Sequence, residues 1–313
     1  MITVVMPAYN AEKYIAEAIE SILNQTFQDF EFIIVNDGST DNTLKIIDQY
    51  AAQDRRIRLV QTDHVGGGAA RNAGVKVAKS DWIAMMDADD ISLPQRLEKQ
   101  VQAAQKSPTV VVWGTYAHKI NAAGKIISKK PFNLGVKTEE EFHAMRQQGK
   151  NITVLHGPVF FKKDIFLKEG GYNPKFEGAE DTELFDRMSD HGLVLALPEI
   201  LYLYRFHGNS VSFNNSLHQK ILGEYIKQRR QARLNGTEVL SLEAFLQQCQ
   251  QQSKWFRLKF YCVTLSDAYY RQANAYYGEK CYWRTTFYLL LAMVLHPNAV
   301  RRVRQRLFTS ATT

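Results

Sequence analysis

Short apolar segments alternate with amphipathic segments through the first 115 residues of the chain. Residues 2–6 (ITVVM) and 30–35 (FEFIIV) are apolar almost throughout, which is typical of strands buried on both faces. From Tyr14 to Ile22, apolar residues recur instead at helical spacing. Further strands are predicted at RIRLVQ, DWIAMM and TVVVWG, with a helix before each. Strands that alternate with helices in this way predict a mainly parallel α/β sheet.

Polar residues follow four of the predicted strands, and several of them are acidic. They are Tyr9 and Asn10, then Asp37, then Asp63, and finally Asp87, Asp89 and Asp90. In sheets of this kind, ligands bind outside the carboxyl ends of the strands. Carboxylates gathered there repel one another unless a cation lies between them. The rim is therefore predicted to bind a cation, and a solvated acidic rim is the alternative.

The triplet Asp87-Ala88-Asp89 has the D-x-D pattern at the end of its strand. Alternate residues of an extended chain point the same way, so both carboxylates can face one ligand. Mg²⁺ and Mn²⁺ prefer oxygen ligands and are commonly held by one or two carboxylates together with substrate phosphates. Acidic triplets also occur by chance, so the motif needs support from elsewhere in the chain.

A glycine-rich segment, HVGGGAARNAG, supplies a second indication of a phosphate ligand. Gly66, Gly67 and Gly68 allow close approach of the backbone, and a predicted helix follows them with its free N–H groups. Arg71 lies early in that helix, where it could meet a phosphate. The segment matches neither the dinucleotide fingerprint nor a Walker loop. A glycine-rich turn without a ligand is the alternative.

The net charge of +7 is unevenly distributed. Residues 216–313 contain fifteen Lys and Arg against five Asp and Glu, whereas residues 1–215 are nearly neutral. This favours a membrane surface or an acidic partner for the C-terminal part, and it argues against a nucleic-acid-binding protein. The three cysteines lack the spacing of a zinc site. Without a signal-peptide pattern or an apolar run of the ~20 residues that a membrane span needs, a cytoplasmic location is expected.

Six segments occur in the order and spacing of a known enzyme family. They are VVMPAYNAEKYIAEAIESILNQTF, IIVNDGSTDNT, GGGAARNAG, WIAMMDADD, GGYNPKFEGAEDTELFDRM and LYLYRFHGNSVS. In these motifs the chain resembles the family 2 glycosyltransferases with the GT-A fold, of the branch that builds bacterial surface polysaccharides. The resemblance implies an inverting, metal-dependent enzyme that moves one sugar from a nucleotide-diphosphate sugar to a hydroxyl group of a glycan acceptor. UDP is the preferred nucleotide, with dTDP or GDP as alternatives.

The resemblance also implies roles for individual residues at the strand ends. Pro7, Ala8 and Tyr9 would border the nucleotide, and Asp37 would hydrogen-bond its base or its ribose. Arg71 would approach the base or the phosphates.

The D-x-D segment would hold the sugar donor and its metal ion. Asp87, together with Ala88, would reach the ribose, and Asp89 would bind the Mn²⁺ or Mg²⁺ ion that bridges both phosphates. His207 would complete the metal shell, although a lone histidine is more often a surface residue. Asp90 would line the same pocket.

The chemistry of the acceptor is expected in the second half of the matched region. By resemblance, Asp181 is the general base for the acceptor hydroxyl, and Glu180 orients it. The alternative is that both are first-turn residues favoured by the helix dipole. His156 would line the donor or acceptor pocket, and Arg205 would contact a phosphate.

The motifs predict a catalytic domain over residues 1–215, with a donor-binding half (1–115) and an acceptor half (116–215). Residues 216–313 are predicted to form a basic, aromatic-rich helical extension that either contacts the inner face of the plasma membrane or only packs on the catalytic domain. By resemblance, the lipid-linked acceptors of the family lie at this inner face of the membrane, which favours the membrane contact. No Q-x-x-R-W signature of processive synthases follows YRFHGNSVS, so a single addition is favoured.

Three other functions compete with this interpretation. A sugar nucleotidyltransferase would need a glycine-rich basic loop after the first strand, where MPAYNAEKY has no glycine. An aspartate phosphatase would carry D-x-D on its first strand and not on its fourth. A catalytically inactive glycan-binding or scaffold subunit at the membrane would have no need for the base Asp181.

Overall fold

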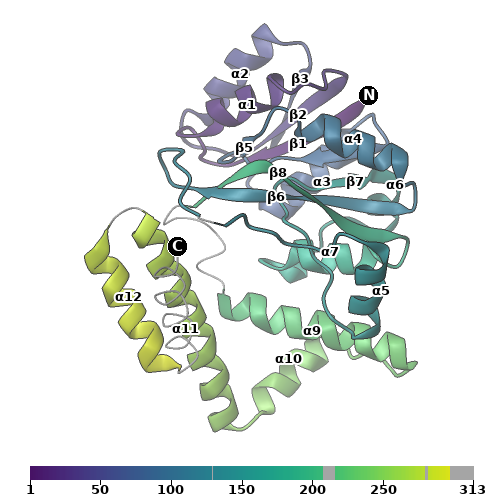
Figure 1. Ribbon diagram of the computed structural model, residues 1–313. Coiled ribbons are helices and arrows are strands. Elements are labelled where there is room, and N and C mark those ends of the chain that lie inside the picture. The colour runs from purple at the N-terminus through teal and green to yellow at the C-terminus, as the bar shows by residue number, and fades with distance from the viewer. Residues whose placement is uncertain (129, 207–215, 279–280, 297–313) are drawn as a thin grey trace. The chain divides into compact units, whose positions relative to one another are not determined.

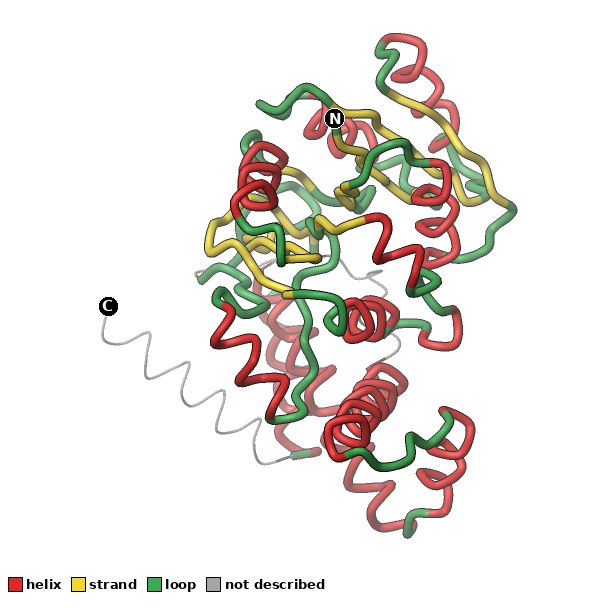
Figure 2. The backbone as a smooth tube through the Cα atoms, turned by 90° about the vertical axis from the view of Figure 1, so that its right-hand side faces the viewer, coloured by secondary structure: helices red, strands yellow, loops and turns green. Residues whose placement is uncertain are grey.

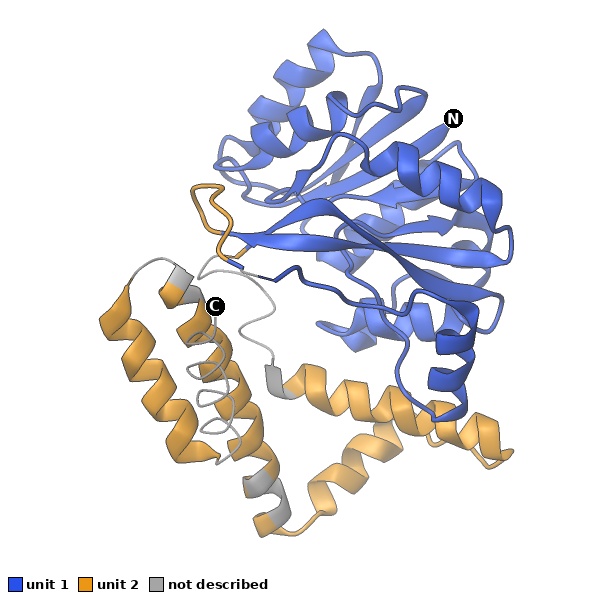
Figure 3. Cartoon of the chain, in the orientation of Figure 1, with its two compact units in different colours: residues 1–120, 128–205 blue, residues 121–127, 206–313 orange. Residues whose placement is uncertain are grey.

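The computed structural model describes residues 1–128, 130–206, 216–278 and 281–296. The chain divides into two compact units, coloured separately in Figure 3. Unit 1 comprises residues 1–120 and 128–205, and unit 2 comprises residues 121–127 and 206–313. Unit 1 contains the strands, while the described part of residues 216–296 is helical apart from its connecting loops (Figure 2).

In the described residues, unit 1 is built on one sheet of eight strands with the order β3-β2-β1-β4-β7-β6-β8-β5 (Figure 1). The strands are β1 (Ile2–Ala8), β2 (Phe30–Asp37), β3 (Ile57–Thr62), β4 (Trp82–Met85), β5 (Ile91–Ser92), β6 (Val110–Ile120), β7 (Phe160–Lys162) and β8 (Leu193–Arg205). β1 pairs in parallel with β2 and β4, β2 with β3, and β6 with β8. The predicted mainly parallel α/β sheet is thereby confirmed.

β7 departs from the simple βα alternation, because it pairs antiparallel with both β4 and β6. The strand predicted at TVVVWG is β6, and β7 lies between it and the first parallel set. The two-residue β5 also pairs antiparallel, with β8. Strands of two or three residues are too short to show a hydrophobic periodicity, so β5 and β7 have no periodic pattern in the sequence.

Helices connect and cover the strands of unit 1. They are α1 (Ile15–Leu23), α2 (Thr43–Gln53), α3 (Gly67–Val77), α4 (Arg96–Lys106), α5 (Glu139–Gln147), α6 (Lys163–Lys168), the 3-10 helix η1 (Pro174–Phe176) and α7 (Glu180–Met188). α1 buries Ile15, Ala18, Ile19 and Ile22, the residues whose spacing predicted it. α7 begins at Glu180, as the sequence predicts.

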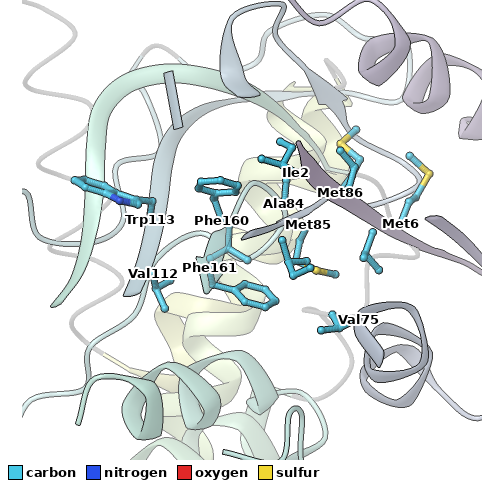
Figure 4. Packing of buried hydrophobic residues seen from close by; sticks show 14 of the residues in the cluster. Ile2, Met6, Val75, Ala84, Met85, Met86, Val112, Trp113, Phe160 and Phe161 are labelled. Atoms are coloured by element: carbon cyan, nitrogen blue, oxygen red, sulfur yellow. The ribbon is translucent and has the colours of Figure 1, made fainter. Parts of the chain in front are cut away.

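The hydrophobic core lies on both faces of the sheet. Because successive side chains of a strand point to opposite faces, the uninterrupted burial from Ile2 to Met6 shows that both faces of β1 are covered. Met85 and Phe161 lie in this core among the residues drawn in Figure 4. Burying one such side chain is favourable by about 1.5–3 kcal/mol.

Close packing of α3 on the sheet depends on Gly74. A Cβ atom at this position would lie 2.5 Å from Cγ1 of Val5 in β1 and 3.0 Å from Cγ2 of Val35 in β2. The absence of a side chain lets α3 approach β1 and β2 directly. This contact positions the N-terminus of α3 beside the ends of those strands.

From residue 216 to residue 296, the described part of unit 2 is helical apart from its connecting loops, as the sequence predicts. It contains α9 (Ser216–Asn235), α10 (Leu242–Gln251), α11 (Lys254–Gly278) and α12 (Tyr282–Leu295). α11 and α12 form a hairpin, in which Oγ of Ser266 donates to the backbone oxygen of Ala292 at 2.8 Å. In the part of the chain that the structure describes, none of the helices has both the length and the apolar character needed to cross a membrane.

Candidate active site

The parallel register brings the ends of β1, β2 and β4 to one edge of the sheet. Ala8 pairs with Asn36, and Val5 pairs with Met85. The residues that follow or end these strands, Tyr9, Asp37 and Asp87, therefore share the rim that the sequence predicts.

Asp37 is buried and organises the loop that precedes α3. Its Oδ1 accepts hydrogen bonds from Oγ1 of Thr62 and from the backbone N–H of Val65, both at 2.7 Å, and its Oδ2 accepts the backbone N–H of Gly66 at 2.9 Å. Gly66 has φ of +90°, a conformation that favours glycine. The carboxylate thus fixes the glycine-rich loop to the end of β2.

His64, in this loop, forms an aromatic pair with Tyr9, which follows β1. The rings of Tyr9 and His64 stack with centroids 4.1 Å apart, and Tyr9 is 45% exposed. Nδ1 of His64 lies 3.8 Å from Oδ2 of Asp37. Pro7 is half-buried and Ala8 is buried. Sequence reasoning missed His64, because its contact with Tyr9 joins segments 55 residues apart.

Arg71 and Asp87 form an ion pair, with Nη2 of Arg71 2.8 Å from Oδ1 of Asp87. Burial alone would raise the pKa of Asp87, but the neighbouring Arg71 guanidinium is the main opposing influence, and the net pKa is lowered. Burial would likewise lower the pKa of Arg71, yet Asp87 keeps it raised. α3 therefore delivers a guanidinium that holds the first carboxylate of the D-x-D triplet ionised.

Side chains from the later part of unit 1 gather beside this ion pair. Nε2 of His156 lies 2.8 Å from the hydroxyl oxygen of Tyr172, and the Arg71 guanidinium lies 6.0 Å from the centre of the Tyr172 ring. Burial lowers the pKa of His156, and the Arg71 charge lowers it further. His156 is therefore held neutral.

The first turn of α7 reaches the same cluster. Oε2 of Glu180 accepts the backbone N–H of Gly178 at 2.9 Å, and burial raises the pKa of Glu180. A Cβ atom at Gly68 would lie 3.3 Å from Oε1 of Glu180. The charge of Asp181 acts on both His156 and Tyr172. The structure thus brings α3 and α7 together at one end of the sheet.

Gly157, in the turn before β7, leaves room for the D-x-D segment. A Cβ atom there would lie 2.7 Å from the hydroxyl oxygen of Tyr202 and 2.9 Å from Oδ2 of Asp87. The Tyr202 hydroxyl accepts the backbone N–H of Asp87 at 3.3 Å. Sequence reasoning singled out none of Gly157, Tyr172 and Tyr202. Tyr172 and Tyr202 do lie in two of the matched segments, GGYNPKFEGAEDTELFDRM and LYLYRFHGNSVS, which is the signal that could have found them.

Arg205 ends β8 and holds the rest of the acidic segment. Its Nε donates to the backbone oxygen of Asp89, and its backbone N–H donates to Oδ1 of Asp90, both at 2.6 Å. Its buried guanidinium also pairs with Glu17 of α1 and lies 4.6 Å from the centre of the Tyr14 ring. The structure therefore shows Arg205 in a buried network, where the sequence predicted a phosphate contact.

The chemistry of this segment fits a hard divalent cation. Burial first, and then the charges of Asp89 and Asp87, raise the pKa of Asp90 well above its usual range. Among the described residues, no three His, Cys, Asp or Glu side chains form a metal site by themselves. One or two carboxylates suffice for Mg²⁺ or Mn²⁺ when substrate phosphates complete the shell. His207 lies outside the described residues.

Comparison with known structures identifies the fold as GT-A. TarS from S. aureus, residues 1–349 in complex with UDP-GlcNAc, is 18% identical, with a TM-score of 0.57 over 97% of this chain and 91% of that one. A mannosyltransferase from Pyrobaculum calidifontis, in complex with GDP-Man and Mn²⁺, is 17% identical, with a TM-score of 0.56 over 99% and 80%.

The model of the glycosyl transferase family 2 matches residues 3–168. The glycosyltransferase GlyG of Streptococcus pneumoniae serotype 4 is 33% identical over 67% of this chain and 72% of that protein. Chondroitin synthase of Pasteurella multocida is 29% identical over 78% of this chain, but the match covers only 25% of that longer protein. The chain belongs to glycosyl transferase family 2 and is a glycosyltransferase.

Proposed function

We propose that this enzyme transfers one sugar from a UDP-sugar to a hydroxyl group of a glycan acceptor, with inversion at the anomeric carbon and with a divalent metal ion. The observation that carries the proposal is the meeting of the Arg71–Asp87 ion pair with His156, Tyr172 and the first turn of α7 at the strand ends. In this proposal residues 1–115 bind the donor and residues 116–215 bind the acceptor.

The nucleotide would lie along the ends of β1 and β2. The Tyr9–His64 ring pair offers an exposed stacking surface for its base, above the loop that Asp37 fixes. Asp37 would accept a further hydrogen bond from the base or ribose, and Asp87 with Ala88 would border the ribose. The TarS structure in complex with UDP-GlcNAc supports a UDP-sugar donor, whereas the mannosyltransferase complex with GDP-Man keeps GDP open.

Asp89 would bind the Mn²⁺ or Mg²⁺ ion, with His207 as a second ligand. When bound, such an ion stabilises the negative charge that grows on the departing diphosphate. The Mn²⁺ in the mannosyltransferase complex supports this assignment. Arg71 would add positive charge beside the phosphates, since its pairing with Asp87 fixes the guanidinium at the strand ends.

Asp181 would act as the general base. Its carboxylate takes the proton of the acceptor hydroxyl while that oxygen forms a bond to the anomeric carbon, and the bond from this carbon to the diphosphate oxygen breaks with its electron pair. Glu180 would orient the acceptor by hydrogen bonding, because burial raises the pKa of its carboxyl group. His156, held neutral, would line the pocket with Tyr172.

The acceptor would be a lipid-linked glycan in surface polysaccharide synthesis. The enzyme would bind it as a peripheral protein on the inner face of the plasma membrane. Chondroitin and hyaluronan synthases among the relatives support a polysaccharide product. This chain spans only about a quarter of the first and a fifth of the second, so the product is proposed by class alone.

Calorimetric titration with UDP, with and without Mn²⁺, tests the donor site. We expect the affinity to fall at least tenfold when either Mn²⁺ is withdrawn or Asp89 is replaced in Asp89→Ala, since each loss leaves the diphosphate charge uncompensated. Asp48→Ala, an exposed carboxylate on α2, is the matched control and should bind UDP normally. Equal affinity without the ion would contradict the metal assignment, and binding of GDP or dTDP alone would change only the nucleotide.

Transfer assays with Asp181→Asn test the base. This variant should bind UDP like the wild type and lose transfer by about 10²-fold or more. Unchanged transfer would remove Asp181 from the chemistry.

A further inference from the structure

α12 exposes a continuous apolar stripe. Trp283, Phe287, Leu290 and Val294 are 69%, 51%, 53% and 84% exposed. They follow one another at intervals of four, three and four residues, so at 3.6 residues per turn all four lie on one side of the helix. Scattered apolar residues are normal on a protein surface, but four aligned ones mark an interaction surface.

The opposite side of α12 is the one that packs. Thr285 and Ala292 are buried, and Ala292 accepts the hydrogen bond from Ser266 of α11. The α11–α12 hairpin is therefore complete without the stripe (Figure 1). An amphipathic helix would present polar residues on its outer side, whereas α12 is apolar on both sides.

The one charged residue of α12 is a cation, Arg284. In the described part, the guanidinium of Arg284 lies 5.1 Å from the centre of the Trp283 ring and 5.2 Å from that of Tyr276. Tyr282 is 61% exposed beside them. Tryptophan and tyrosine next to arginine are the composition of a segment at the boundary between lipid and water.

We propose that this stripe is the docking surface for an anionic lipid bilayer. With fourteen residues, α12 is about 21 Å long, too short to span a bilayer, so it would lie in the plane of the interface. Phe287, Leu290 and Val294 enter the acyl boundary, Trp283 lies at the headgroup level, and Arg284 faces the lipid phosphates. The stripe would make the membrane contact that is part of the proposed function, and in that respect it rests on that function, but lipid binding by the stripe requires neither a lipid-linked acceptor nor a particular donor.

A second copy of the chain fits the stripe less well than lipid does. Two such helices would bring one guanidinium group, that of Arg284, from each copy to the same interface, and like charges oppose association. Four side chains on one helix are also far fewer than the roughly 20–30 residues a side of a standard protein interface. Anionic headgroups, in contrast, complement the charge.

Co-sedimentation of the full chain with vesicles tests the proposal. Vesicles of equal parts phosphatidylglycerol and phosphatidylcholine should bind the wild type, and Trp283→Ser/Phe287→Ser should lower the partition constant about tenfold or more, because two large side chains no longer enter the lipid. The matched control is Trp255→Ser/Leu258→Ser, which removes side chains that are 76% and 51% exposed. Trp255 lies eleven residues along α11 from Ser266, about 16 Å away, so the control should change binding less than about twofold.

Three results would overturn the proposal: no binding of the folded wild type, equal loss in both double variants, or equal binding to pure phosphatidylcholine vesicles. Light scattering that shows a wild-type dimer and a monomeric Trp283→Ser/Phe287→Ser would assign the stripe to a second copy instead. UDP titration without vesicles separates this inference from the proposed function. The stripe variant should bind UDP as the wild type does, so a failed donor site and a failed membrane surface give different results.

Discussion

At the scale of single residues, the candidate site depends on positions where a side chain is absent. Gly157 faces both the Tyr202 hydroxyl and the Asp87 carboxylate at distances that no Cβ atom tolerates. Gly68 faces Glu180 in the same way, with less crowding. The carboxylates of Asp87 and Glu180 are therefore held close to backbone, and we expect the geometry of each to respond to the addition of one methyl group.

Gly157→Ala should displace Asp87 and lower both stability and UDP affinity. Overpacking of this kind costs about 1–3 kcal/mol, measurable by urea unfolding. Adding Tyr202→Phe removes the hydroxyl oxygen 2.7 Å from the new methyl group and should restore part of the stability without restoring UDP affinity. A fully stable, fully active Gly157→Ala would show that the turn before β7 yields easily.

His156 makes the stability of unit 1 depend on pH. Burial and the Arg71 charge lower its pKa, against the opposing charges of Asp87 and Asp181. The unfolded chain takes up the proton near pH 6.5 while the folded chain does not, so stability is lost as the pH falls below about 6.5. His156→Gln should reduce the change of the unfolding free energy with pH, measured by urea unfolding at several pH values. His143→Gln, at an exposed histidine, is the control and should leave that change as in the wild type. The same change with pH in both variants would contradict the assignment to His156.

At the scale of elements, Arg205 joins three parts of unit 1. It connects the end of β8 to α1 through Glu17 and to the D-x-D segment through Asp89 and Asp90. With these partners, we expect Arg205 to act as a positioning residue that orients the acidic segment.

Arg205→Lys should weaken metal-dependent UDP binding and destabilise the protein by about 3–5 kcal/mol, as expected when a buried charge network loses a partner. Titration of UDP against Mn²⁺ concentration, together with urea unfolding, measures both effects. Arg58→Lys, whose side chain donates one hydrogen bond at an exposed position, is the control. Retained stability with lost UDP binding would instead favour the phosphate contact predicted from the sequence.

The elements also show what the sequence could predict. The runs that form β1 and β2 are buried on both faces, which leaves a strong local pattern, and α1 and α7 begin near the predicted residues. The acidic residues of the rim could be predicted because each follows the end of a predicted strand. The antiparallel β7, the Tyr9–His64 stack and the His156–Tyr172 contact depend on packing between distant segments, which no local pattern records.

At the scale of the whole molecule, the two units differ in composition and in expected ligand. Unit 1 contains the strand-end rim, and unit 2 contains the basic, aromatic helices. A ligand that binds only the folded form of one unit stabilises that unit by mass action.

UDP with Mn²⁺ should therefore raise the unfolding temperature of unit 1. A concentration of about 100 times the Kd adds about 2.7 kcal/mol, which corresponds to a shift of roughly 5–11 °C for a domain of this size. Differential scanning calorimetry of the full chain, with Asp89→Ala as the control, measures it. No shift at saturating UDP would contradict a donor site in unit 1.

The hydrogen bonds of Asp37 set a limit on redesigning nucleotide preference. Its carboxylate ties Thr62, Val65 and Gly66 together, so an exchange at Asp37 would release the loop before it altered selectivity. The ring of Tyr9, which follows β1, stacks on that of His64 in the loop, and the contact of His64 with Asp37 is longer, at 3.8 Å. An engineer who wishes to change the accepted base should randomise those two positions and leave their support intact.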